Sequence, residues 1–233
     1  MPTNSPRHQA ALLVAAILLA FAVFAVWPGL DLWMTGLFYD PVRGFAGLDT
    51  GPANTVRLAI WHLSELMLLL SVAALAAGLW TRAAVLGVPR KVWAFIALLY
   101  LLAPGLLVDA ILKRVWGRAR PADVTQFGGV LRFTPPNEIA HQCSKNCSFV
   151  AGEMAGAVAL AVALAMILHH LRPRLPAWVH RCGMVLVVVL PAYSGFQRIA
   201  AGRHFLSDVI FATLVVLLVA VGLRAWMFRP ARP

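Results

Sequence analysis

Two short polar runs at the ends of long apolar segments carry the side chains of this chain that are best suited to chemistry. The first run, from Lys113 to Arg120, holds a lysine and an arginine seven positions apart. The second places His204 six positions after Arg198 and Asp208 four positions after the histidine. Charges where a bilayer meets water are costly unless they are paired or used, so both runs are candidate functional sites.

Three of these residues, Lys113, Arg120 and Arg198, can converge on one tetrahedral oxyanion such as a phosphate. Arginine offers a planar fork that matches phosphate oxygens, and lysine supplies a movable point charge. The alternative is that the cations only anchor helix ends at the membrane surface, the common role of isolated basic residues in membrane proteins. Three neighbouring arginines that lack the spacing are interpreted as anchors or head-group contacts: Arg114, Arg118 and Arg203.

His204 and Asp208 are four residues apart, so they share one face at the start of a predicted helix. A carboxylate beside an imidazole fixes its tautomer and leaves the other ring nitrogen free. That nitrogen can attack phosphorus and form a phosphohistidine, which splits hydrolysis into two easier steps. The alternative is a structural polar pair in which Ser207 or Asp208 caps the helix.

The elements that must position these residues are membrane-spanning helices. The composition is 61% hydrophobic and 12% charged, far more apolar than a soluble domain. Six apolar stretches are long enough to cross about 30 Å of hydrocarbon. They cover residues of about 10–27, 58–80, 92–112, 149–170, 182–197 and 205–228. Because backbone groups in lipid must be hydrogen-bonded locally, we expect an all-α polytopic bundle that forms one domain over residues 1–233.

The basic residues between the spans divide into ten on each side of the membrane. Eight of those on the side of the polar runs lie in or beside the runs, where a binding site requires them. Setting these eight aside leaves ten basic residues on one side of the membrane and two on the other. Because cytoplasmic loops carry the excess of lysine and arginine, the side with ten, which includes both termini, is expected to be cytoplasmic, and the polar runs are expected on the outer face. The first span lacks a small-residue cleavage site, so we interpret it as an uncleaved helix and not as a signal peptide.

The formal net charge of +11 also bears on the partners of the protein. A strongly basic chain can bind nucleic acid, but here the cations flank membrane spans. Anionic lipid head groups and the bilayer itself are therefore the expected partners, and nucleic acid is not. The sequence does not indicate an oligomeric state.

Two connecting segments on the outer face are longer than simple connectors. We expect residues 28–57 to include a short interfacial helix, with Trp33, Phe38 and Tyr39 at head-group depth. We expect residues 113–148 to form turns. Cys143 and Cys147 in this second segment can form a disulfide, remain free thiols, or bind a metal with His141, although this spacing matches no common zinc site.

Taken together, the two runs resemble the type 2 phosphatidic acid phosphatase family, which includes membrane lipid phosphatases and, more distantly, vanadium haloperoxidases. The resemblance rests on a lysine, six residues and an Arg-Pro pair, followed downstream by an arginine, five residues, a histidine, three residues and an aspartate. It implies phosphate-binding roles for Lys113, Arg120 and Arg198. It also implies that His204 is the nucleophile and that Asp208 orients it.

The middle motif of that family is altered in this chain. Where the family has Pro-Ser-Gly-His, the sequence reads Val150-Ala151-Gly152-Glu153, so the family's phosphate-binding serine and its acid histidine are absent. We expect Gly152, near the start of the fourth span, to let backbone N–H groups approach the phosphate. Glu153 replaces the acid histidine in one interpretation. In the other, the site has lost its acid, and His141 is an outside candidate for that role.

The resemblance implies a phosphatase that acts on a lipid phosphate at the outer leaflet of a bacterial inner membrane. The segment Asn146–Glu153 is similar to that of lipid A phosphatases, with undecaprenyl pyrophosphate and phosphatidylglycerophosphate as alternative substrates. No metal or other cofactor is expected, since no carboxylate cluster is available to hold Mg²⁺. The competing functions are a non-hydrolytic lipid-phosphate carrier and haloperoxidase-like vanadate chemistry.

Overall fold

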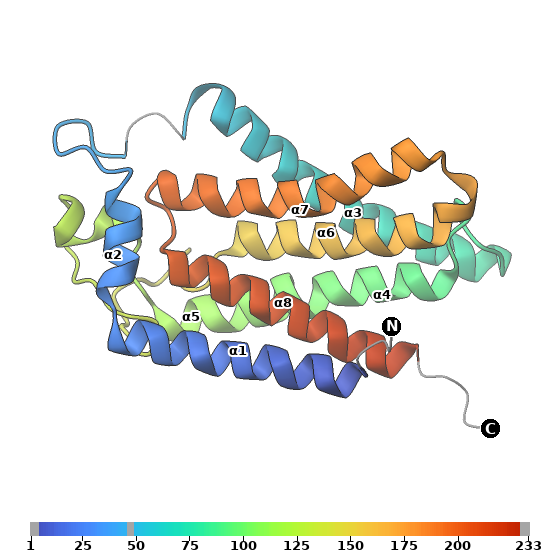
Figure 1. Ribbon diagram of the computed structural model, residues 1–233, viewed down its shortest axis with the longest axis horizontal. Helices are drawn as coiled ribbons and strands as arrows, with labels where there is room; N and C mark the ends of the chain where they lie inside the picture. The colour runs from blue at the N-terminus through green and yellow to red at the C-terminus, as the bar shows by residue number, and fades with distance from the viewer. Residues whose placement is uncertain (1–4, 46–48, 229–233) are drawn as a thin grey trace.

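The computed structural model describes residues 5–45 and 49–228, which form a bundle of long helices (Figure 1). Within these residues, six segments are long and apolar enough to cross a membrane, which confirms the predicted all-α polytopic bundle. They are Pro6–Val26, Gly51–Thr81, Arg90–Asp123, Gly152–Arg174, Ala177–Ala200 and Leu206–Met227. The only β-structure in the described part of the chain consists of isolated bridges.

Each expected span corresponds to a long helix, but several boundaries differ. The long helices are α1 (Pro6–Val26), α3 (Gly51–Thr81), α4 (Arg90–Tyr100), α6 (Gly152–Leu171), α7 (Ala177–Ala200) and α8 (Leu206–Met227). The second span begins seven residues earlier than predicted, and this extension brings its first turns to the end of the bundle that carries the candidate site residues. The fourth begins three residues later than predicted, so residues 149–151 are an irregular approach to α6 and not its first turn.

The third span continues past α4 without a break. It passes through a π-helix, η1 (Leu101–Leu112), which contains Pro104, and ends in the single turn α5 (Lys113–Trp116). Shorter elements complete the fold: α2 (Gly29–Gly36) and the 3₁₀ turns η2 (Pro121–Asp123), η3 (Thr125–Phe127) and η4 (Arg172–Arg174). Apart from α5, the segment 113–148 consists of turns and irregular backbone, as predicted.

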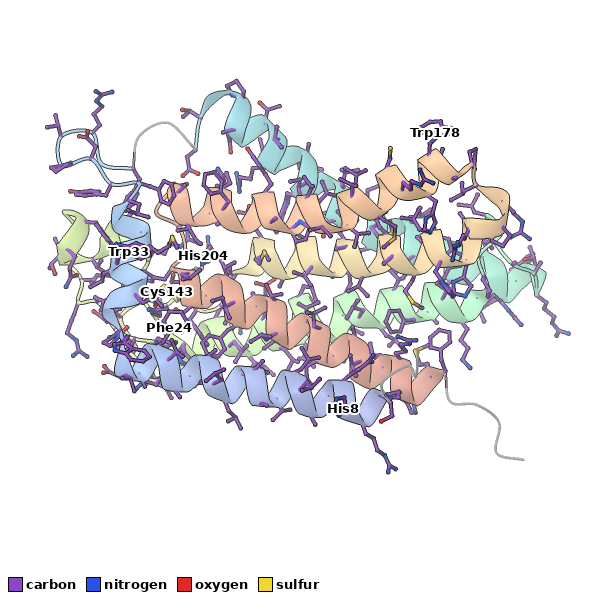
Figure 2. The ribbon with its side chains drawn as sticks, in the orientation of Figure 1. His8, Phe24, Trp33, Cys143, Trp178 and His204 are labelled. Carbon is purple, nitrogen blue, oxygen red and sulfur yellow. A yellow bond between two sulfur atoms is a disulfide. The ribbon has the colours of Figure 1, made fainter. Side chains whose placement is uncertain are left out.

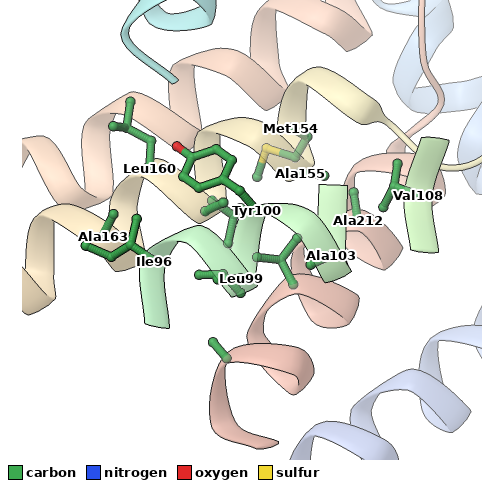
Figure 3. Close-up of a cluster of buried hydrophobic side chains, with 14 of the residues drawn as sticks. Ile96, Leu99, Tyr100, Ala103, Val108, Met154, Ala155, Leu160, Ala163 and Ala212 are labelled. Carbon is green, nitrogen blue, oxygen red and sulfur yellow. The ribbon is translucent and has the colours of Figure 1, made fainter. Parts of the chain in front are cut away.

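Helix α6 lies at the centre of the bundle, packed against α3, α4, α7 and α8. Much of its buried surface consists of small residues, which let neighbouring helices approach closely where lipid supplies no hydrophobic drive for association. These residues are Ala155, Gly156, Ala157, Ala159, Ala161 and Ala163. Figure 3 shows Ile96, Leu99 and Tyr100 of α4 packed beside this helix.

The outer helices expose large apolar side chains over long stretches of their surfaces. Leu18 and Leu19 on α1, Leu66 and Leu69 on α3, and Val188 on α7 are all more than half exposed. A soluble protein rarely leaves such a continuous apolar surface in water. These faces are therefore the lipid-contacting surface of a multi-pass membrane protein.

The residues singled out by the sequence gather at one end of the bundle, on the left in Figure 1. Helix α2 lies across this end, which also holds the end of α7 and the starts of α6 and α8. Helix α1 begins and α8 ends at the opposite end. From the sequence, ten basic residues are assigned to the cytoplasmic side. Two of them, Arg229 and Arg232, lie outside the described residues.

The connecting segments are more tightly attached to the protein than the sequence suggested. A short helix, α2, is present in the 28–57 region as predicted, and Trp33 on it is exposed. In contrast, Phe38 packs edge-on against Phe196, and Tyr39 packs against the rings of Phe45 and Phe127. Phe38 and Tyr39 therefore pack against other rings of the protein, and their position at head-group depth stays a prediction.

Two local features fix the course of the 113–148 segment. Gly117 ends α5 in a left-handed conformation, and a Cβ at this position would lie 2.8 Å from the Cα of His141. Cys143 and Cys147 form a disulfide, which confirms the first of the three alternatives considered. The disulfide closes a five-residue loop just before α6.

Candidate active site

A cavity of about 430 Å³ opens at the functional end of the bundle. Five of its lining side chains are cationic: Arg57, Lys113, Arg120, Arg198 and Arg203. Two are carboxylates, Asp49 and Glu153, and the remaining lining residues are Asn54, Trp61, Asn146 and His204. The excess of positive charge makes the cavity suited to an anion. The three cations predicted to converge, Lys113, Arg120 and Arg198, all line it.

His204 lies on the turn between α7 and α8, marked in Figure 2, and is only 4% exposed. Its Nδ1 is 2.8 Å from the carbonyl oxygen of Ser148. A carbonyl can only accept a hydrogen bond, so Nδ1 must carry the proton. In the neutral ring the lone pair then resides on Nε2, the nitrogen a nucleophile would use.

Burial lowers the pKa of His204 below its ordinary value. Asp208 acts in the opposite direction, and the positive charges of Arg120 and Lys113 add to the effect of burial. The neutral ring is therefore the stable form near neutral pH.

Asp208 lies beside the histidine, as the four-residue spacing predicted, but it does not make the contact that fixes the tautomer. Its Oδ2 is 3.7 Å from Nδ1 of His204. The same oxygen accepts hydrogen bonds from Ser148 Oγ at 2.5 Å and from the Phe205 N–H at 2.8 Å. Asp208 thus holds Ser148, and the carbonyl of Ser148 holds the ring of His204.

Arg118 is not a head-group contact or anchor, contrary to the interpretation from its sequence position. Its side chain is fully buried, and its guanidinium donates at 2.7 Å to Asp208 and at 2.8 Å to Asp31. Further donors and acceptors complete the cluster: Arg118 Nε bonds the Thr134 carbonyl, and Ser207 donates to Asp31. Burial raises the pKa of Asp31, and the charge of Arg118 opposes this shift.

Glu153, on the first turn of α6, lines the cavity where the family resemblance places an acid. Its carboxylate accepts two hydrogen bonds of 2.7 Å from Nε and Nη2 of Arg57, in the bidentate geometry typical of strong arginine–carboxylate pairs. A third contact of 3.3 Å comes from Arg198 Nη1. Glu153 is therefore the counterion of two arginines.

Asp49 joins two further arginines across the cavity. Its Oδ1 pairs with Arg198 at 2.9 Å and its Oδ2 with Arg203 at 2.6 Å. Burial would raise the pKa of Asp49, but the hydrogen bond and charge of Arg203, together with Arg198, outweigh this and lower it. Arg203, interpreted from the sequence as an anchor or head-group contact, is therefore a lining residue of the site.

Lys113 and Gly152 meet at the start of α6. The ammonium of Lys113 pairs with Asp109 at 2.8 Å, one turn back along the π-helix. A Cβ built on Gly152 would lie 2.5 Å from Lys113 Nζ, so only glycine leaves room for the lysine here. The space at Gly152 is therefore taken by the end of the lysine side chain, and the approach of backbone N–H groups to a phosphate stays a prediction. Arg120 is held separately by a 3.0 Å bond from its Nε to the Asn146 carbonyl.

Sequence reasoning missed part of this site. Asp49, Asn54, Arg57 and Trp61 line the cavity but belong to the connection before α3 and the first turns of that helix, outside every recognised motif. The only available signal was the position of Arg57 at the outer end of a span. His141, the outside candidate for the acid, does not line the cavity. No group of three or more metal-ligand side chains is found in the described parts of the chain.

The sequence profile of the PAP2 superfamily matches residues 93–232, which include every predicted site residue. The chain belongs to the PAP2 superfamily. It is 30% identical over 217 residues to a lipid A 4'-phosphatase of Rhizobium leguminosarum, covering 88% of this chain and 90% of that protein. It is also 35% identical over 140 residues to a lipid A 4'-phosphatase of Francisella tularensis subsp. novicida. That second match covers 60% of each protein, less than two thirds of the Francisella chain.

A solved structure extends the likeness to the whole bundle. The crystal structure of a transmembrane PAP2-type phosphatidylglycerolphosphate phosphatase from Bacillus subtilis superposes with a TM-score of 0.61, covering 96% of this chain and 99% of that one. The two share 18% sequence identity, so this comparison concerns the fold alone. Family and relatives together confirm the prediction of a membrane lipid phosphatase.

Removing one partner of the buried Arg118 cluster should destabilise the protein. Asp31→Asn preserves the shape of the side chain but leaves Arg118 with one fewer counterion, a change that typically costs about 3–5 kcal/mol. We expect a clearly lower Tm in detergent and a loss of phosphatase activity. Asp40→Asn, in an exposed turn of the same segment, is the matched control. Equal, small decreases of Tm in Asp31→Asn and Asp40→Asn would contradict a structural role for Asp31.

Gly152→Ala should impair phosphate binding without unfolding the protein. The added methyl group meets the flexible end of Lys113, which can move at little cost in stability but then leaves its position in the cavity. We expect a raised KM with an almost unchanged Tm. The control is Gly222→Ala on α8, where a Cβ meets no atom within 4 Å. An unchanged KM in Gly152→Ala would show that the lysine does not contact substrate from this position.

Proposed function

We propose that the protein hydrolyses a phosphomonoester of a lipid A-type glycolipid by way of a phosphohistidine on His204. Two relatives named lipid A 4'-phosphatase support the choice of lipid. The observation that carries the mechanism is the hydrogen bond from His204 Nδ1 to the Ser148 carbonyl, because it leaves the lone pair on Nε2. We propose that residues 1–233 form a single phosphatase domain.

In the first chemical step, Nε2 of His204 attacks phosphorus and the bond from phosphorus to the lipid oxygen breaks. The developing charge on the phosphoryl oxygens is met by the fixed cations of the cavity, among them Lys113, Arg120 and Arg198. In the second step, water attacks phosphorus, the phosphorus–nitrogen bond breaks, and inorganic phosphate leaves with the histidine regenerated. Because these cations supply the positive charge, the proposed reaction needs no metal.

Glu153 is the proposed general acid, and its present partners suggest how it obtains a proton. A bound phosphate offers oxygen acceptors to Arg57 and Arg198, the two arginines that Glu153 now neutralises. A carboxylate left beside a phosphate dianion repels it, so protonation of the carboxylate accompanies binding. The protonated group then donates to the leaving lipid oxygen and recovers a proton from the attacking water.

We place the site on the periplasmic face of the inner membrane. The distribution of basic residues outside the polar runs supports this orientation. The disulfide at Cys143 and Cys147 supports it independently, because such bonds persist in oxidising compartments and are rare in the cytosol.

Phosphate release by purified protein in detergent with EDTA tests the function. We expect release from lipid A, and compare phosphatidylglycerophosphate and undecaprenyl pyrophosphate. His204→Ala should abolish turnover and leave substrate binding largely intact. Glu153→Gln should lower turnover by about 10²–10⁴-fold, the usual contribution of a general acid, and Glu153→His should retain activity. Full activity of Glu153→Gln would remove this residue from the mechanism, and turnover by His204→Ala would remove the proposed nucleophile.

The pH dependence of kcat/KM should report the environment of His204. Attack requires the neutral ring, so the rate rises with pH as the histidine loses its proton. Burial lowers the pKa of His204, so the acid limb should have its midpoint below the ordinary histidine value of about 6.5. An acid limb centred above 6.5, measured with the same lipid substrate, would contradict this environment.

A further inference from the structure

A second cavity, of about 660 Å³, lies beside the candidate active site. Its lining residues are Asp109, Lys113, Arg114, Ser144, Lys145 and Asn146. Lys113 and Asn146 also line the first cavity, so the two spaces adjoin along these two side chains. Neither the family resemblance nor the proposed mechanism uses the second cavity.

The charges of this second cavity are not balanced within the protein. Its one carboxylate, Asp109, is already paired with Lys113. Arg114 and Lys145 are exposed, and no ion pair to either side chain is present in the described part of the chain. The hydroxyl of Ser144 and the side-chain amide of Asn146 add neutral hydrogen-bond donors to the lining. Two uncommitted cations flanked by neutral donors form an arrangement suited to an oxyanion.

The backbone that carries these groups is held in place on both sides. Arg114 belongs to α5, whose end is fixed by the turn at Gly117. Lys145 and Asn146 lie inside the loop closed by the disulfide, and the Asn146 carbonyl accepts the hydrogen bond from Arg120 of the first cavity. The second cavity is thus attached directly to the phosphate-binding residues of the first.

We propose that this cavity is a subsite for a second oxyanion on the head group of the same lipid, one that is not cleaved. The inference rests on the proposed function, because it assumes that the first cavity holds the scissile phosphate. Two adjoining cavities that share Lys113 can hold two anionic groups of one molecule, and the second group then contributes to affinity and to the choice of substrate. The second oxyanion can be a phosphate or the carboxylate of an acidic sugar.

The test compares diglucosamine lipids with one and with two anionic groups in neutral detergent. The reference substrate carries only a 4'-phosphate. A second substrate carries a 1-phosphate in addition to the 4'-phosphate, and a third carries an acidic sugar at the 6' position in addition to the 4'-phosphate. Comparing these two substrates distinguishes a phosphate from a carboxylate as the second oxyanion. The variants are Arg114→Gln, Lys145→Gln and the double variant. Arg132→Gln is the control, because this arginine is an exposed cation of the same segment that lines neither cavity.

We expect the native protein to prefer at least one of the two-anion lipids. The double variant should lose about tenfold in kcat/KM for that lipid, through KM, as expected for charged hydrogen bonds, and keep its rate on the one-anion lipid. No preference in the native protein, or equal losses on all lipids, would overturn the subsite. If the double variant loses kcat/KM on the two-anion lipid only when phosphatidylglycerol is added to the detergent, the cavity binds a neighbouring lipid. This result would also overturn the subsite.

A binding measurement separates failure of the subsite from failure of the proposed function. His204→Ala protein in nanodiscs, which cannot turn over, is titrated with the same lipids. Tighter binding of a two-anion lipid that is lost when Arg114 and Lys145 are replaced supports the subsite even if no lipid of the set is hydrolysed. Equal binding of all lipids overturns it, whatever the outcome of the phosphate-release assay.

Discussion

A single buried cation holds together the end of this protein that carries the candidate active site. Arg118 has no access to water, and the carboxylates of Asp31 on α2 and Asp208 on α8 both pair with it. Asp208 in turn binds Ser148, and the carbonyl of Ser148 binds His204. Buried ion pairs recover little or no net stability after desolvation. The arrangement is therefore better explained by position than by stability, since it links three distant segments to His204, the proposed nucleophile.

The cavity itself is organised by a different kind of contact: its two carboxylates lie among the cations, in positions that also suit the oxygens of a phosphate. Glu153 neutralises Arg57 and Arg198, and Asp49 neutralises Arg198 and Arg203. Five cations in one cavity would repel one another without such counterions. The carboxylates keep the cations converged. In the proposed reaction, the phosphate of the substrate replaces them by offering similar oxygen geometry. Phosphate binding, as proposed, is then an exchange of one anion for another.

Hydropathy predicted the spans well because lipid requires each apolar segment to satisfy its own backbone hydrogen bonds. The motif spacing likewise identified Lys113, Arg120, Arg198 and His204, which do line one cavity. The buried role of Arg118 could not be predicted, because its partner Asp31 lies 87 residues earlier in the chain. The pair of Arg57 and Glu153 is separated by 96 residues. Such pairings depend on how the helices pack, and no local periodicity records them.

The length of α3 has a consequence for the setting in which the protein works. Its 31 residues extend about 46 Å, against the roughly 30 Å of a hydrocarbon core, whereas α1 with 21 residues matches that core closely. Helix α3 must therefore tilt or project beyond the apolar layer, and its first turns carry Asn54, Arg57 and Trp61 to the cavity. Helix tilt adjusts to bilayer thickness. Because Arg57 on α3 pairs with Glu153 on α6, a change in the tilt of α3 acts directly on the ion pair that lines the cavity.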